Sequence, residues 1–133
     1  KYVAVVVAAI ASMVIGGLWY SPMLFGKISI KLSGMTEKQM AEAKKKGMAK
    51  SYVLAYVGSA VMAYILAHFA SYAGAATPLE GAMAGFWAWL GFVVPVILGS
   101  YLWECKKLQL FVLNIAHYLV ALVVMGAILA AWP

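Results

Sequence analysis

The sequence predicts an all-α membrane protein, in which a single domain over residues 1–133 forms a bundle of four transmembrane helices. Hydrophobic residues make up 66% of the chain and charged residues 11%, and the mean hydropathy is +0.94. Soluble domains carry about 25% charged residues, so this composition excludes an ordinary soluble globular protein. The hydrophobic residues also gather in four long runs, which is the pattern of a chain that crosses a bilayer four times.

Each of the four runs has the length that a helix needs to cross a hydrocarbon core of about 30 Å. The runs cover residues 2–20, 51–72, 79–103 and 108–132. The first run has no basic leader beyond Lys1 and has the length of a full span. We therefore expect a retained helix there, with a cleavable signal peptide as the alternative.

The lysines predict how the chain is oriented in the cell membrane. Nine of the ten lysines fall in residues 21–50 or in the short third loop, whereas the second loop, 73–78, has none. Because alternate loops lie on opposite faces and basic loops stay inside, we expect residues 21–50 in the cytoplasm and both termini outside. Aromatic residues near the span ends fit interfacial anchors at these depths, namely Trp19, Tyr20, Tyr52, Tyr101 and Trp103 inside, and Tyr72 and Trp132 outside.

The long loop carries helical signals of its own. Ser21 and Pro22 form an N-cap and first-turn pair, and apolar residues recur from there to Gly34. This pattern predicts a short amphipathic helical segment at the membrane interface between the first two spans. Thr36 and Gln39 fit a capping box that opens a second short helix. We interpret the lysine run after it as a solvated face near anionic lipid, with a partner-binding patch as the alternative.

Small residues at every fourth position predict where the helices pack on one another. Lipid tails provide no hydrophobic force between helices, so close backbone contact has to hold them together. Such ladders pack within one chain or against a second copy, and we expect a homo-oligomer in the lipid bilayer. The ladder positions are Ala4, Ala8, Ser12 and Gly16 in the first span, Ala55, Ser59, Ala63 and Ala67 in the second, and the shorter pairs Gly81 with Gly85 and Gly126 with Ala130.

Polar residues inside the spans are few, and each needs a partner or a function there. Glu80 is explained by Thr77 and Pro78, which together with it form a capping box for the third helix. His68 and His117 lie at depths that differ by about 11 Å, which is too far for one metal ion to reach both. We therefore expect no metal and no cofactor. Cys105 is the single cysteine, so an intrachain disulfide is impossible.

Asn114 and His117 lie three residues apart on one helix face, at the level of Pro95 in the third span. Pro95 cannot donate the hydrogen bond that the Gly91 carbonyl receives in a regular helix. We expect Asn114 or His117 to donate to this freed backbone, with ligand binding as the alternative. Glu104 fits either an ion pair at the cytoplasmic edge or an acceptor at the mouth of a cleft. The candidate ligand or pathway residues are Trp19, Trp103, Glu104, Asn114 and His117.

Aromatic motifs along nearly the whole chain resemble a small bacterial membrane-protein family known as domain of unknown function 1761. The resemblance lies in Leu18–Pro22 with Phe25 and Gly26, in Gly85–Phe92, in Leu102–Glu104 and in Val124–Leu129. It implies a four-helix membrane architecture. It implies no reaction, cofactor or catalytic residue.

The function we expect is a non-enzymatic membrane module that self-associates and holds a lipid or a small amphipathic molecule. Four helices enclose little volume, so we expect the pocket to form between subunits. The alternative is a small oligomeric transporter or channel, in which Glu104, Asn114 and His117 line the path beside a helix broken by Pro95. The sequence has no nucleophile with a base and no paired carboxylates, which argues against an enzyme. Its basic residues are all lysine, which argues against readout of nucleic acid.

Overall fold

The protein is described by a computed structural model that covers residues 2–21, 28, 31–32, 38, 42, 48–104 and 107–132. Every regular element in these residues is a helix, and four helical stretches are long and apolar enough to cross a membrane. The all-α fold class is therefore confirmed, whereas the short helical segments expected between the first two spans fall almost entirely outside the described residues. The elements are α1 (Tyr2–Trp19), α4 (Met48–Tyr72), α5 (Pro78–Ala88), the π-helix η1 (Trp89–Val93), α6 (Val94–Trp103) and α7 (Leu108–Ala131).

Local sequence signals determine where the helices turn between α4 and α5. Gly74 adopts a positive φ of 70°, and the Ala75 and Gly74 amides donate to the carbonyls of Ala70 and Ser71. This is a Schellman motif, which favours glycine because only glycine adopts such a φ without strain. Thr77 then caps α5, because its hydroxyl accepts from the Glu80 amide at 3.2 Å and donates to the Glu80 carboxylate at 3.0 Å. The expected capping box is confirmed.

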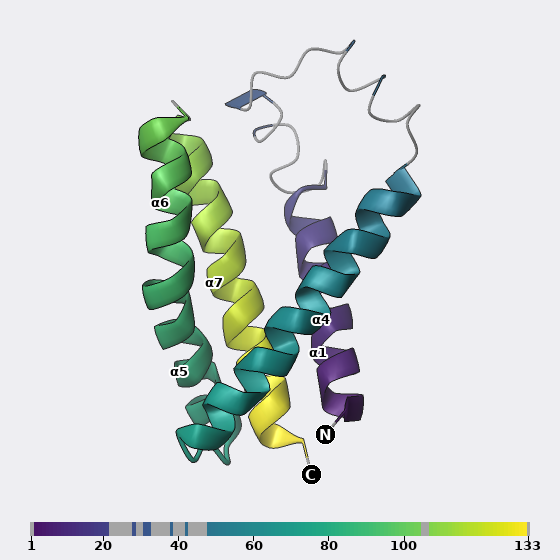
Figure 1. The fold of residues 1–133 in the computed structure, drawn as a ribbon, viewed down its shortest axis with the longest axis vertical. Helices are drawn as coiled ribbons and strands as arrows, with labels where there is room; N and C mark the ends of the chain where they lie inside the picture. The colour runs from purple at the N-terminus through teal and green to yellow at the C-terminus, as the bar shows by residue number, and fades with distance from the viewer. Residues whose placement is uncertain are drawn as a thin grey trace.

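The four membrane-length helices run up and down, with α7 in contact with every other described helix (Figure 1). Both chain ends and the α4–α5 turn lie at one end of the bundle, as four successive crossings require. In Figure 1, α4 runs obliquely across the bundle, so that its first turns diverge from α7 while its last turns approach it. This tilt decides where the bundle is tightly packed and where it is open.

The core is small and consists of residues from α1, α4 and α7 that meet below the divergence of α4. Ala8, Ala63 and Met125 are completely buried, and Leu66 and Leu122 pack beside them. Between 11% and 22% of the residues in each span are buried, so most of the apolar surface of these helices faces outward. Such a surface is suited to lipid, because water would make its exposure costly.

The two small-residue ladders of α1 and α4 meet along part of their length. Ala4, Ala8 and Ser12 of α1 are buried, and the Ser12 hydroxyl lies 3.4 Å from that of Ser59 on α4. Ala55, one turn before Ser59, is exposed because α4 has tilted away at that level. Close packing of α1 on α4 therefore extends to the Ser12–Ser59 contact and stops above it.

The closest backbone approach in the described chain is between α5 and α7. A Cβ atom added to Gly81 would lie 2.0 Å from the Gly126 carbonyl oxygen, and one added to Gly85 would lie 2.1 Å from the Leu122 carbonyl oxygen. A Cβ on Gly126 would likewise lie 2.1 Å from the Gly81 carbonyl oxygen. No side chain fits at these positions, so the glycines allow the two backbones to touch.

The π-helix η1 ends two residues before Pro95, and it is the way in which the third span accommodates this proline. The Val94 amide donates to the Trp89 carbonyl, five residues earlier, which widens the helix by one residue at this turn. Local π-type adjustment is a known way in which membrane helices tolerate proline. Neither Asn114 nor His117 donates to this backbone among the hydrogen bonds of the described residues. Instead, the Trp89 indole donates to the Ile115 carbonyl of α7 at 2.7 Å.

The glycine contact between α5 and α7 predicts a sharp difference between two alanine substitutions in the same span. We expect Gly85→Ala to lower the free energy of unfolding by about 1 to 3 kcal/mol or more, since the new methyl group would overlap backbone atoms. Gly99→Ala is the matched control, because a Cβ there meets nothing within 4 Å. It should be neutral or stabilising by up to about 1 kcal/mol. Thermal unfolding in detergent measures both, and equal stability of the two variants would show that α5 and α7 do not touch.

Candidate functional site

A cleft of about 760 Å³ opens between α1, α4 and α7 above the point where the small-residue ladders stop. It exists because α4 diverges there from the other two helices. Its lining is made of small, apolar and hydroxyl-bearing residues, namely Ser12, Met13, Gly16, Gly17, Tyr20, Tyr52, Ala55, Gly58, Ser59, Met62, His117 and Tyr118. None of these described residues carries a charge when histidine is neutral.

His117 is the unusual residue of this cleft. Its side chain is 9% exposed, and neither Nδ1 nor Nε2 has a hydrogen-bond partner among the described residues. Its ring lies between aromatic rings, with centroid distances of 5.2 Å to Tyr20 and 4.8 Å to Tyr118. A buried polar group without a partner costs about 1 to 3 kcal/mol, so its presence requires an explanation.

Gly16 makes room for the imidazole. A Cβ atom at this position would lie 3.2 Å from His117 Nε2, so any larger residue would press on the ring. Both ring nitrogens are covered by protein atoms, and a turn of the imidazole is needed to present them to the cleft. Gly16 was predicted as a helix-packing residue, and it contacts the side chain that lines the cleft.

The end of α1 above His117 is attached to α7 by two hydrogen bonds. The Tyr20 hydroxyl donates to Asn114 Oδ1 at 2.6 Å, and the Trp19 indole donates to the Leu113 carbonyl at 3.2 Å. The Trp19 and His117 ring centroids are 6.2 Å apart. These contacts fix the α1–α7 side of the cleft, and on the α4 side the hydrogen bond between Ser12 and Ser59 marks the end where the helices close on each other.

The structure brings together three of the five sequence-predicted site residues, namely Trp19, Asn114 and His117. Trp103 is 85% exposed on α6, and the Glu104 carboxylate accepts a hydrogen bond from the Ser100 hydroxyl. These two residues lie on the α6 side and do not line the cleft. Asn114 lines a separate hollow of about 160 Å³ beside Ser100 of α6. The ligand role expected for a cleft at Trp19, Trp103 and Asn114 stays a prediction.

Sequence reasoning missed Tyr20 and Tyr118 as parts of this site. We interpreted Tyr20 as an interfacial anchor from its place at the end of a span. Tyr118 gave a usable signal, since it lies four residues after Asn114 and next to His117, on a helix whose other residues are mostly aliphatic.

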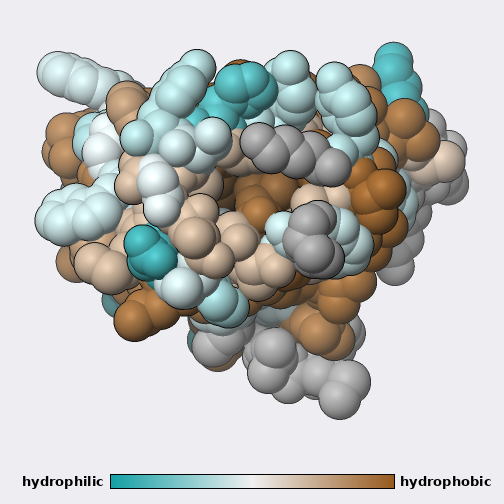
Figure 2. Space-filling model, turned by 90° about the horizontal axis from the view of Figure 1, so that it is seen from below, coloured by the Kyte–Doolittle hydropathy of each residue, from teal (hydrophilic) through white to brown (hydrophobic). Residues whose placement is uncertain are grey.

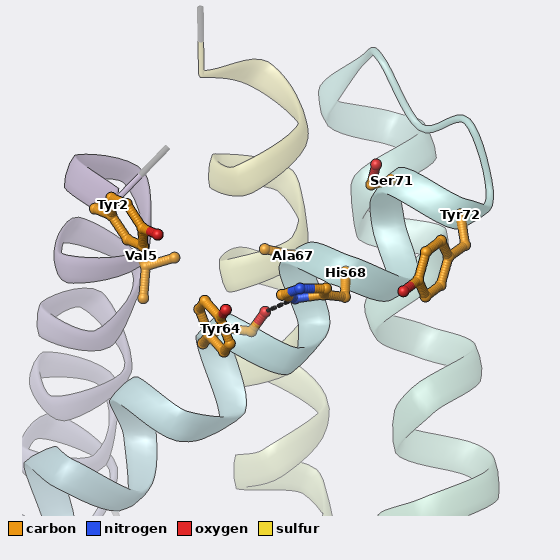
Figure 3. A pocket seen from close by; sticks show the side chains of 7 residues that line it. All are labelled: Tyr2, Val5, Tyr64, Ala67, His68, Ser71 and Tyr72. Atoms are coloured by element: carbon orange, nitrogen blue, oxygen red, sulfur yellow. Dashed lines mark hydrogen bonds between the residues drawn. The ribbon is translucent and has the colours of Figure 1, made fainter.

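The second histidine lies in a different place, in a pocket of about 280 Å³ between the start of α1 and the end of α4 (Figure 3). His68 Nδ1 lies 2.9 Å from the Tyr64 carbonyl oxygen. Because a carbonyl only accepts, Nδ1 carries the hydrogen. Tyr64 and Tyr72 flank the exposed imidazole edge to face, at 4.7 and 6.3 Å. A satisfied histidine among tyrosines at a span end fits an interfacial aromatic belt.

Viewed from the end that holds both termini, the molecule shows a hollow with an apolar floor and more polar side chains around it (Figure 2). A further hollow of about 190 Å³ at the end of α7 shares Ala67 and Ser71 with the His68 pocket. No group of three or more histidine, cysteine or acidic side chains in the described residues is arranged to hold a metal ion. The unsatisfied His117 therefore distinguishes the cleft between α1, α4 and α7 as the candidate ligand site.

Comparison with known proteins gives one match. The model of a family described as "Protein of unknown function (DUF1761)" matches residues 3–130. No curated protein and no solved structure matches the chain. The match covers α1 through α7 almost completely, and with them every residue that lines the cleft.

The unsatisfied His117 predicts that a less polar residue of similar volume is tolerated or even stabilising. We expect His117→Met to leave the free energy of unfolding unchanged or to raise it by about 1 kcal/mol, because no hydrogen bond is lost and no buried polar atom remains unpaired. Asn114→Leu is the contrasting variant and should destabilise, because it removes the acceptor of Tyr20. Thermal unfolding of the ligand-free protein in detergent is the measurement. A strong loss of stability in His117→Met would mean that the imidazole has a structural partner.

Proposed function

Because the chain belongs to the family described as a protein of unknown function, DUF1761, which has no assigned activity, we propose a function from the cleft itself. This multi-pass membrane protein binds a lipid or another small amphipathic molecule between α1, α4 and α7. The observation that carries the proposal is His117, which is buried, unpartnered and part of the wall of a cleft of about 760 Å³. An occupant with a polar group would provide the missing hydrogen bond after a turn of the ring.

The size and the chemistry of the cleft support this proposal. Ligand sites typically measure about 300–1,000 Å³ and combine an apolar lining with a few polar groups. Here the apolar part comes from Met13, Ala55 and Met62, and the polar part includes His117 and the hydroxyl of Ser59. The sequence-based expectation placed the pocket between subunits. The cleft within one chain is large enough, so the proposal no longer depends on oligomerisation.

Self-association stays part of the proposal, and the cleft does not require it. Ala55 and Gly58 of α4 are exposed, but both line the cleft, so we do not place a second copy of the chain there. Most residues of each span are not buried within one chain, and we propose a second copy as the partner of part of this apolar outer surface.

A transporter or channel is the second candidate, supported by the proline and the π-helix that interrupt the third span. However, two of its three proposed path residues are engaged elsewhere. Asn114 accepts from Tyr20, and Glu104 accepts from Ser100. We therefore favour ligand binding over transport.

Native mass spectrometry of protein extracted from membranes with a mild detergent tests ligand binding and self-association together. We expect a retained adduct with the mass of a small lipid, and oligomers beside the monomer. Ser59→Trp should reduce the adduct about tenfold, since a large side chain would occupy the cleft. Val6→Leu is the control, because Val6 is 47% exposed and outside the cleft. A spectrum with only bare monomer would count against both parts of the proposal.

We also propose that the cleft lies in the cytoplasmic half of the membrane. The two ends of the described bundle differ in lysine content, and the positive-inside rule assigns the lysine-rich end, with Lys50 and Lys107, to the cytoplasm. Trp19, Tyr20 and Tyr52 lie at the same end as these lysines. Both termini and the α4–α5 turn then face outward.

Cysteine labelling in intact cells tests this orientation. In a Cys105→Ser background, Ala76→Cys should react with a membrane-impermeant maleimide, because the α4–α5 turn is exposed and proposed to face outward. Lys107→Cys should react after the cells are permeabilised, and it provides the matched control. Labelling of Lys107→Cys but not of Ala76→Cys in intact cells would invert the orientation.

A further inference from the structure

A second hollow adjoins the cleft and differs from it in chemistry. This groove has a volume of about 450 Å³ and lies between α4, the α5–η1 junction and α7. Every residue that lines it is apolar, namely Val61, Met62, Ile65, Leu66, Phe69, Ala88, Phe92, Val93 and Leu122. The groove offers no hydrogen-bond donor or acceptor from these side chains, so its occupant must be hydrocarbon.

The cleft and the groove follow one another along α4 and α7. Met62 lines both of them. On α7 the cleft ends with Tyr118 and the groove includes Leu122, one helical turn further on. The two hollows therefore border on each other at Met62, and we call them together the trough. Its part near His117 carries polar groups, and its part farther from the lysine-rich end is apolar.

The π-helix builds the outer wall of the apolar part. Phe92 of η1 stacks on Phe69 of α4, with ring centroids 6.1 Å apart and planes inclined by 24°. The two rings are 66% and 42% exposed, so they border the groove without filling it. The groove shares Met62 with the cleft, so a ligand in the groove would lie next to the cleft.

We propose that the trough binds an uncharged single-chain lipid, with its hydroxyl or carbonyl head group at His117 and its acyl chain in the groove beside Phe92. This inference rests on the proposed function and names its ligand class. A neutral imidazole offers one donor and one acceptor, and serine and tyrosine hydroxyls offer both, which matches a hydroxyl-bearing head group. No charged side chain lines either hollow in the described residues, so an ionised head group would remain unpaired at a high cost.

The trough runs along the bundle away from the lysine-rich end. His117 is the tenth of the 24 residues of α7, and the groove extends along α4 to Phe69, three residues before that helix ends at Tyr72. A ligand bound in this way would have its head group near the middle of the span and its acyl chain directed toward the end that holds both termini.

Photo-crosslinking of the whole protein in lipid nanodiscs tests the inference. The probe is a monoacylglycerol with a diazirine in its acyl chain, and the labelled residues are mapped by peptide mass spectrometry. We expect labels on Ile65, Phe69 and Phe92, and competition by unlabelled monoacylglycerol. Val61→Trp should lower this labelling about tenfold, because it fills the groove.

Val57→Trp is the matched control. It lies one turn from Val61 on α4, is similarly exposed (51% against 57%), and lines neither hollow, so labelling should change less than about twofold. Ala88→Leu is a second way to narrow the groove. Ser59→Trp should lower the groove labels as well, because it displaces the head group of the same molecule.

Three results would overturn the inference. The first is labelling spread evenly over lipid-facing residues such as Val96, and the second is groove labelling that Ser59→Trp leaves unchanged. Either result would mean that the probe labels the helices as ordinary bilayer lipid and does not bind in the trough. The third is equal competition by the fatty acid of the same chain length in its ionised form, which would show that the site does not select an uncharged head group. In each case a lipid adduct that depends on Ser59 in native mass spectra would still support the proposed function, so the two proposals fail separately.

Discussion

The contact between α5 and α7 is the constraint on which the rest of the bundle depends. Lipid surrounds these helices, so dispersion between closely fitted surfaces has to provide much of their association. Gly81, Gly85 and Gly126 let the two backbones meet at a distance that no Cβ atom would permit. This contact positions α7, and α7 in turn supports α1 and α4. The remaining helices can then depart from close packing without loss of the fold.

The tilt of α4 is such a departure from close packing. Its last turns join the core through Ala63 and Leu66, while its first turns leave α7 and expose the wall that contains His117. Two aromatic neighbours of His117 are already paired, since Tyr20 donates to Asn114 and Trp19 donates to Leu113. A protein selected for stability alone would gain by replacing the imidazole with an aliphatic residue. The unsatisfied nitrogens are therefore better explained by a function of the cleft than by the needs of the fold.

The sequence predicted the helices better than it predicted the site, and the reason is physical. Span length, the Thr77–Glu80 cap and the small residues at every fourth position depend on neighbours in the chain, so they could be recognised without coordinates. The cleft depends on the tilt of α4, which no local pattern encodes. The depths of Asn114 and Pro95 predicted a contact between them, but depth does not determine which way a side chain faces. The π-helix was missed for a related reason, since Pro95 indicated a lost hydrogen bond without indicating how the backbone would compensate.

The π-helix has a consequence for comparing this chain with its relatives. A π-turn holds one residue more than the α-helical turn it replaces. It therefore adds the equivalent of one residue between Ala88 and Val94 to the third span. A relative with one residue fewer here would align with this chain only through a one-residue gap at this point. In such a relative, the residue that corresponds to Phe92 would lie on a different face of the helix. The residues after the gap that face lipid, and those that face the bundle, would then differ from the ones in this chain.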